Sequence, residues 1–155
     1  EQGKLAIIIN ENSASASEFF SAAMQDYNRA MIVGSTSLGK ASMQTILPLD
    51  DNQQDFVKLT VEKFYRITGD SNQIKGIIPD IALPILYDSI IAREISYKTA
   101  LKYDEIHSKV RFTPFRKDYY PTIIEQSNSR SKNNMLLNEI NNTSSRHWAR
   151  IAMNK

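Results

Sequence analysis

The chain has no cysteine and only two histidines, His107 and His147. The missing thiol excludes disulfides, thiolate metal sites and a cysteine nucleophile. Neither histidine has a second histidine or a carboxylate at metal-ligand spacing, so the sequence predicts no zinc or iron site. We interpret both histidines as surface or packing residues and expect no cofactor.

Long apolar runs are also missing. No stretch approaches the roughly 20 residues that a membrane helix needs, and a hydrophobic content of 41% with 23% charged residues is ordinary for a globular protein. The chain opens on Glu1 without a methionine or a signal peptide and enters an apolar run almost at once. We therefore expect a piece of a longer protein.

Charge is unevenly distributed along the 155 residues. Residues 1–107 contain ten basic and fourteen acidic residues, whereas residues 108–155 contain nine basic and three acidic ones. We interpret the basic part as a solvated helical face. The alternative is a patch for an anionic membrane surface or an acidic partner, at about 1 kcal/mol per well-placed basic residue. The aromatic interleaving and basic density that favour nucleic acid binding are missing.

The hydrophobic pattern of the first 34 residues predicts an α/β fold. Leu5–Ile9 is apolar without alternation, as expected for a strand covered on both faces. From Ala16 to Tyr27 the apolar positions recur at helical spacing, and Ala30–Gly34 is again apolar and short. Strand, helix and strand within about 30 residues predict a βαβ unit with parallel pairing.

The remaining pattern divides at Pro84. Two strand-like runs, "SMQTILPL" and "FVKLTVEKFYRI", flank the polar "DDNQQD" and predict a hairpin. The segment "IKGIIPDIALP" is interpreted as extended because glycine and proline interrupt it. We predict a partial α/β domain over residues 1–84 and a mostly helical C-terminal extension over residues 85–155, with a flexible or exposed bend at "EQSNSRSKNN".

The string "SASASE" follows the first predicted strand directly and allows two interpretations. Ser15 and Glu18 form the S-x-x-E pattern of a capping box, which is a structural role. The alternative is that Ser15 is a nucleophile, which requires a base from elsewhere because a serine hydroxyl is nearly unreactive. Glu18 is the wrong base, since a solvated glutamate has a pKa of about 4.3.

A lysine can serve as that base where burial lowers its pKa towards neutrality. Lys40 is the candidate, because it follows Gly39, whose missing Cβ allows a close approach of the backbone, and lies in the loop "STSLGK" between two predicted strands. Gln44, four residues later, returns to the same face, and its amide oxygen could accept a hydrogen bond from the lysine amine. The alternative for Gln44 is an exposed strand residue.

Residues 10–49 resemble the catalytic segment of the C-terminal processing peptidases, also called tail-specific proteases. That family has its nucleophile as the middle serine of an S-A-S-A-S/A-E string, a lysine 25 residues later in a T/S-F/Y-G-K-G/A string, and a glutamine four residues further on. Ser15, Lys40 and Gln44 match these positions and spacings, and "GIIPDI" matches a later family string. Leu38 replaces the usual aromatic residue, and Ser35 stands where an acidic residue is common.

The resemblance implies a serine-type endopeptidase with a Ser/Lys dyad assisted by glutamine, on a crotonase- and Clp-protease-like fold. It also implies polypeptide substrates with exposed, often apolar C-termini, and a bacterial periplasmic or cell-envelope location. The backbone N–H of Ala16 is the expected oxyanion donor. An upstream PDZ domain and a second oxyanion donor belong to the family pattern but lie outside this chain.

Two alternatives stay open. One is a non-catalytic scaffold that keeps the fold and binds peptides or partner proteins, and the weaker one is acyl-CoA chemistry on the related crotonase-like architecture. Because Leu5–Ile9 and Ala30–Gly34 are apolar on both faces, we expect the chain to form homo-oligomers, exchange elements between copies, or cover its sheet with the tail at 123–140.

Overall fold

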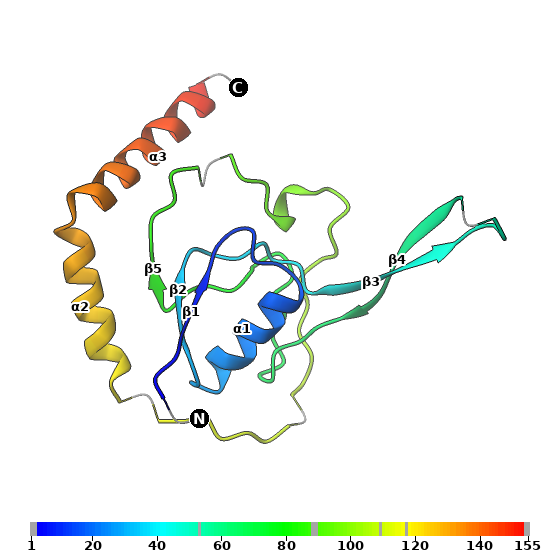
Figure 1. Cartoon of the computed structure of the whole chain (residues 1–155), viewed down its shortest axis with the longest axis horizontal. Coiled ribbons are helices and arrows are strands. Elements are labelled where there is room, and N and C mark those ends of the chain that lie inside the picture. Colours follow the sequence, from blue (N-terminus) through cyan, green and yellow to red (C-terminus); the bar gives the residue numbers. More distant parts are fainter. Residues whose placement is uncertain (1–2, 53, 88–89, 109, 117, 154–155) are drawn as a thin grey trace.

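The computed structural model describes residues 3–52, 54–87, 90–108, 110–116 and 118–153. It contains a three-stranded sheet, a separate hairpin and three α-helices (Figure 1). In chain order the elements are β1 (Ala6–Ile9), α1 (Ala16–Asp26), β2 (Met31–Gly34), β3 (Ser42–Pro48), β4 (Phe56–Lys63), β5 (Ile81–Ala82), the 3₁₀ helix η1 (Glu94–Ser96), α2 (Tyr120–Lys132) and α3 (Met135–Met153).

The predicted βαβ unit is confirmed. β1 pairs with β2 in parallel from Ala6 opposite Met31 to Ile9 opposite Gly34, and α1 connects the two strands. β5 adds to the other edge of β2, also in parallel, which gives the order β1-β2-β5. The fold is therefore α/β, and the carboxyl end of β1 leads directly into the turn before α1.

β2 is the central strand and contributes side chains to two core layers. Ile32, fully buried, packs with Ile9 of β1 and Ala22 of α1. Met31 faces the other way and packs with Ile81 of β5 and Tyr120 of α2. The sheet thus lies between α1 and α2. Ile123 and Ile124 of α2 complete the second layer, so the tail covers one face of the sheet.

Two expectations about burial are wrong in part. β1 is an edge strand, and its Ile8 is 81% exposed, so this strand is not covered on both faces as β2 is. In α1 the fully buried positions are Glu18, Ser21 and Ala22, whereas Phe19 is 53% exposed. The helix therefore buries Glu18 and two small side chains in place of its phenylalanines.

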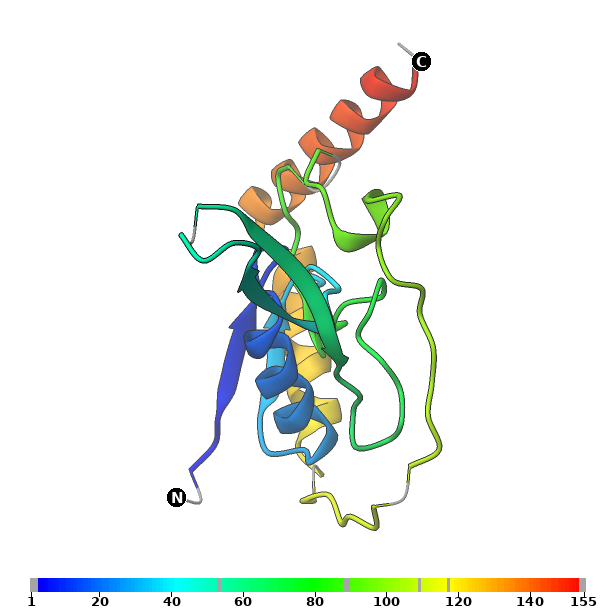
Figure 2. The same ribbon diagram turned by 90° about the vertical axis from the view of Figure 1, so that its right-hand side faces the viewer.

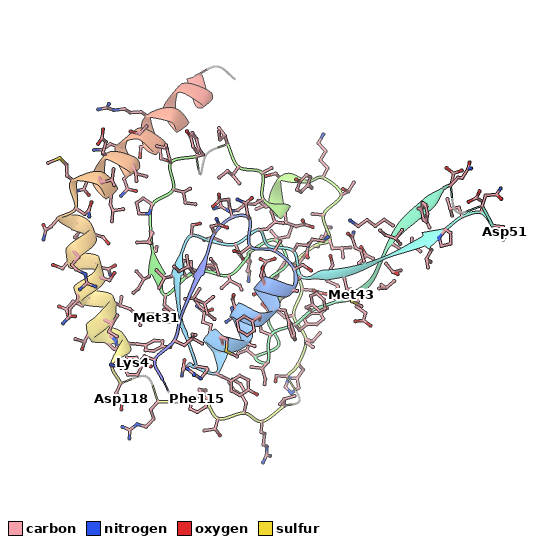
Figure 3. The ribbon with its side chains drawn as sticks, in the orientation of Figure 1. Lys4, Met31, Met43, Asp51, Phe115 and Asp118 are labelled. Atoms are coloured by element: carbon pink, nitrogen blue, oxygen red, sulfur yellow. The ribbon has the colours of Figure 1, made fainter. Side chains whose placement is uncertain are left out.

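β3 and β4 form the predicted hairpin, antiparallel from Ser42 opposite Lys63 to Pro48 opposite Phe56. The ribbon extends away from the body of the molecule in Figure 1 and towards the viewer in Figure 2. In Figure 3, Met43 lies near its base and Asp51 at its tip. The register shifts between Met43 and Gln44, a bulge that lies just where the ribbon leaves the body.

The C-terminal extension is helical only in its second part. Among the described residues between 85 and 118, the only helix is η1, and the rest is irregular. The bend predicted at "EQSNSRSKNN" is wrong for most of its length, because α2 continues to Lys132 and the chain turns only at Asn133 and Asn134. α3 then leads away from the sheet in both views (Figures 1 and 2). No described helix has the length and apolarity needed to cross a bilayer. The division at Pro84 stays a prediction.

Candidate active site

Ser15 lies on the sharp turn between β1 and α1, where it is the N-cap residue of the helix. Its backbone has φ 54° and ψ −112°, a region that side chains with a Cβ rarely adopt. Such local strain concentrates at functional sites, and a serine on a strained strand-to-helix turn is the arrangement that exposes a nucleophilic hydroxyl. Ala16 begins α1, so its N–H is one of the donors that a helix leaves free for other acceptors at its N-terminus.

Lys40 lies in the loop between β2 and β3, as predicted, and Gln44 lies near the start of β3. The Lys40 Nζ donates a hydrogen bond of 2.9 Å to Gln44 Oε1. Gln44 Nε2 in turn donates to Thr60 Oγ1 of β4 at 3.4 Å. The predicted lysine–glutamine contact is therefore present, and the hairpin orients the amide.

Glu18 connects the nucleophile candidate to the lysine loop. Its carboxylate is 1% exposed and accepts four hydrogen bonds. Oε2 accepts the N–H of Ser15 and the N–H of Lys40, both at 2.9 Å. Oε1 accepts the Ser37 hydroxyl at 2.5 Å and the Gly39 N–H at 2.8 Å. One carboxylate oxygen thus fixes the backbones of Ser15 and Lys40 beside each other.

Sequence reasoning recognised Glu18 only as one half of a capping box. The hydrogen bond from the Ser15 N–H to Glu18 is the capping-box bond. The three bonds that Glu18 accepts from the loop before β3 were not predicted. The pattern "STSLGK" is compatible with a site for an anionic group, because a serine hydroxyl and two backbone N–H groups around a glycine can surround an anion. The sequence did not indicate that the buried carboxylate of Glu18 is the group that this loop surrounds.

Gly39 is required where it stands. Its φ is 92°, and a Cβ at this position would lie 2.9 Å from the backbone oxygen of Ile74. The Ile74 N–H donates to the Gly39 oxygen at 2.7 Å. The close backbone approach predicted for Gly39 is therefore confirmed, and its neighbour is the turn at 73–76.

A cavity of about 760 Å³ lies along α1. Phe19 of α1 and Tyr27, the residue that caps its C-terminus, line it together with Phe64, Ile67 and Ile106. The Phe19 and Phe64 ring centroids are 5.5 Å apart. The Phe64 N–H donates to the Ala41 oxygen at 2.8 Å, so this end of the cavity adjoins the Lys40 loop.

The charges in the cavity wall are compensated within the protein. Arg66 pairs with Asp26 at 2.5 Å, with side-chain exposures of 18% and 6%, and also donates to Gln25 Oε1 at 2.9 Å. His107 lines the same cavity. The side chain of His147 lies outside the described residues. Within the described part of the chain, no group of three metal-ligating side chains comes together.

The lysine loop and the serine turn also touch directly. The Leu38 N–H donates to the Ser13 oxygen at 3.0 Å. Together with the bonds to Glu18, this contact brings all three predicted site residues, Ser15, Lys40 and Gln44, to one place at the carboxyl ends of β1 and β2. This is the edge at which parallel α/β sheets bind their ligands.

Comparison with known proteins identifies related peptidases. The tail-specific protease of Haemophilus influenzae is 36% identical over 157 aligned residues, which cover 97% of this chain and 20% of that protein. The carboxy-terminal-processing protease of Bartonella bacilliformis is 43% identical over 83 residues, covering 54% of this chain and 19% of that protein. The chain spans about one fifth of the length of these curated relatives.

Similar solved structures include the photosystem II D1 C-terminal processing protease, with 31% identity and a TM-score of 0.46 over 52% of this chain and 20% of that one. Mature CPAF has 26% identity and a TM-score of 0.49, over 54% of this chain and 16% of that one. The sequence model of peptidase family S41 matches residues 1–83, more than half of the chain. The chain therefore belongs to peptidase family S41.

Proposed function

We propose that this chain carries the nucleophile and the general base of a C-terminal processing serine peptidase. Ser15 Oγ attacks the carbonyl carbon of the scissile peptide bond while Lys40 Nζ accepts the hydroxyl proton. The carbon–nitrogen bond then breaks as Lys40 returns that proton to the leaving amine. A water molecule, deprotonated by the same lysine, releases the acyl group and regenerates the Ser15 hydroxyl.

The observation that supports this proposal most is the shared carboxylate. A nucleophile and its base must be held within hydrogen-bond reach, and Glu18 Oε2 accepts the backbone N–H groups of both Ser15 and Lys40. The lysine amine is oriented by a neutral amide, since Gln44 Oε1 accepts its hydrogen bond. A capping role alone gives no reason for the lysine amine to be oriented at the same edge of the sheet.

The oxyanion formed during attack needs donors as well. We assign one of them to the N–H of Ala16, where the positive end of the helix dipole adds to the hydrogen bond. A second donor would come from the upstream region expected from the family. Loss of one such donor costs about 10² to 10³ in turnover, so we expect the 155-residue chain alone to be nearly inactive.

The family and the cavity support a proposal for the substrate class. We propose that the enzyme cleaves proteins of the bacterial cell envelope near their exposed C-termini. An upstream PDZ domain would select the ends of these substrates. The cavity beside α1 supports apolar substrate side chains, because aromatic rings line it and its Arg66 and Asp26 charges satisfy each other. An acidic side chain would meet an Arg66 that already pairs with Asp26.

A fluorophosphonate probe on the natural full-length protein tests the proposal. We expect covalent labelling and peptide cleavage, and the loss of both in Ser15→Ala. Ser17→Ala is the matched control, because Ser17 lies in the same string and its Oγ donates to the nearby Ala14 oxygen. Lys40→Ala should lose at least about 10³-fold in kcat, since nucleophile and base act as one unit. Gln44→Ala should keep weak activity.

Three results would contradict the proposal. A full-length protein that is folded but neither labelled nor active would support the non-catalytic scaffold. Near-normal turnover by Lys40→Ala would remove lysine as the base. Labelling that persists in Ser15→Ala would move the nucleophile to another serine.

A further inference from the structure

The backbone around Lys40 is held on its second side by residues far away in the sequence. Glu18 holds the N–H of Lys40 itself. On the other side of the lysine, the N–H of Ala41 donates to Gln73 Oε1 at 2.9 Å. The peptide groups on both sides of the proposed base are thus each bound by a side chain from another segment.

Gln73 is fully buried, and both ends of its amide are used. Its Oε1 accepts from Ala41, and its Nε2 donates to Glu94 Oε1 at 3.1 Å. An amide of this kind can turn over and exchange its oxygen with its NH₂ group. The carboxylate of Glu94 accepts only, so it selects the orientation in which the oxygen faces Ala41.

Glu94 reaches the lysine loop by its backbone as well. Its N–H donates to the Leu38 oxygen at 3.0 Å. The neighbouring Arg93 places Nη2 at 3.5 Å from the Thr36 oxygen. The start of η1 therefore contacts the loop before Lys40 directly, and it contacts the residue after Lys40 through Gln73.

We propose that Glu94 and Gln73 are positioning residues for the general base, and that the C-terminal extension thereby contributes to catalysis. This inference rests on the proposed function of Lys40. Glu94 lies beyond residues 1–83, which the family model matches, but within a chain that the Haemophilus influenzae tail-specific protease matches over 97% of its length. The extension supports the loop: without the Glu94 carboxylate, the buried Gln73 Nε2 loses this acceptor and the amide is anchored through its bond to Ala41. The less firmly held amide then lets the loop move Lys40 off its productive position.

The effect of losing this support falls on the chemical step. A displaced base leaves substrate binding largely unchanged but removes an interaction made during proton transfer, and shifts of about 1 Å can cost on the order of 10²-fold. For Glu94→Ala in the natural full-length protein we expect kcat to fall about 10-fold or more with KM within about twofold. Glu94→Gln should recover most of the activity, because its amide oxygen can still accept from Gln73 Nε2.

Controls separate positioning from a general loss of folding. Glu125→Ala makes the same change on an exposed position of α2 and should leave kcat unchanged. Rates are expressed per serine labelled by the fluorophosphonate probe, so unfolded molecules do not count. Gln73→Leu should lower kcat like Glu94→Ala, and the double variant should be no worse than Gln73→Leu alone, because both changes break one chain of contacts.

The outcomes distinguish this inference from the proposed function. If cleavage depends on Ser15 and Lys40 but Glu94→Ala keeps the wild-type kcat per labelled site, the positioning role of Glu94 is refuted and the mechanism stands. An additive double variant, or a Glu94→Gln variant as impaired as Glu94→Ala, also refutes it. If no Ser15-dependent cleavage exists, both proposals fail together.

Discussion

Replacing Glu18 by glutamine removes one oxygen and tests how strongly the serine turn is joined to the lysine loop. The two carboxylate oxygens each accept two hydrogen bonds. An amide retains one oxygen and turns two N–H donors towards the groups that the other oxygen had served. Whichever way the amide lies, two bonds to the carboxylate are lost and at least one backbone N–H faces a donor, so a change that conserves shape is not conservative here.

The magnitude follows from the bond count. Hydrogen bonds to charged groups contribute about 1.5 to 3 kcal/mol each, so two of them amount to about 3 to 6 kcal/mol of unfolding free energy. Small domains have about 5 to 15 kcal/mol in total. With a urea m-value of about 1.5 kcal/mol/M, the unfolding midpoint of this chain should fall by about 2 M or more. Circular dichroism at 222 nm measures it.

Glu11→Gln is the matched control for this experiment. Glu11 is also buried, at 8% exposure, but its two hydrogen bonds, from Asn12 Nδ2 and Ser35 Oγ, are both 3.4 Å long. Long bonds of this kind contribute little, and we expect a loss below about 1 kcal/mol. Equal midpoints for Glu11→Gln and Glu18→Gln would refute the argument that Glu18 joins the two segments.

Three further predictions concern the sheet and its cover. Burial raises the pKa of Tyr120 to about 12, so its neutral form stabilises the fold. This contribution to the unfolding free energy should be fully present below pH 10 and be lost between about pH 10 and 12, and Tyr120→Phe should make the decline shallower in urea titrations. Ile123→Asp places a carboxylate in the layer under α2 and should lower the urea midpoint, whereas Leu136→Asp, at a 63% exposed position, should not. The edge strand β1 exposes Ile8, so the isolated chain should self-associate in size-exclusion chromatography with light scattering. Ile8→Lys should shift it towards the 17.7 kDa monomer. A wild-type chain that is already monomeric, with no change in Ile8→Lys, would contradict this.

The local pattern predicted those parts of the fold that depend on short-range periodicity. The apolar runs around Ile7 and Ile32 became the paired strands β1 and β2, and the spacing from Ala16 to Tyr27 became α1. The polar break before Phe56 became the hairpin connection. Each of these features is set by side chains a few residues apart, which is the range over which hydrophobic periodicity carries information.

Burial of each face could not be predicted in the same way. An apolar strand has the same pattern at the edge and at the centre of a sheet, and Ile8 became exposed whereas Ile32 became fully buried. The difference depends on strand order and on α2, whose Ile123 lies more than 90 positions further along the chain. Tertiary arrangement, not periodicity, decides which side of a strand is covered.

In the candidate site, too, residues related by short sequence spacing were predictable, and residues that act on distant segments were not. Ser15, Lys40 and Gln44 were recognisable because their spacing is fixed by one βαβ crossover and one strand, and the structure brings them to one edge of the sheet. Glu18 and Gln73 were not, because their partners are backbone N–H groups, which every residue except proline has and which leave no trace in a sequence. A backbone N–H group becomes part of a specific site when the fold directs it at one acceptor. The positive-φ turn at Gly39 does this for the bond to Glu18.

The Lys40 loop is held by several other segments, which affects how the candidate site tolerates substitutions. Its loop receives support from α1 through Glu18, from the turn at 73–76 through Gln73, and from the extension through Glu94. Because these supports act on adjacent peptide groups, loss of one leaves the others to limit the movement of the loop, and losses within one chain of contacts do not add. The support from Glu18 differs because its carboxylate binds both the serine turn and the lysine loop. Its loss leaves the Leu38–Ser13 backbone bond to hold the proposed nucleophile near the proposed base.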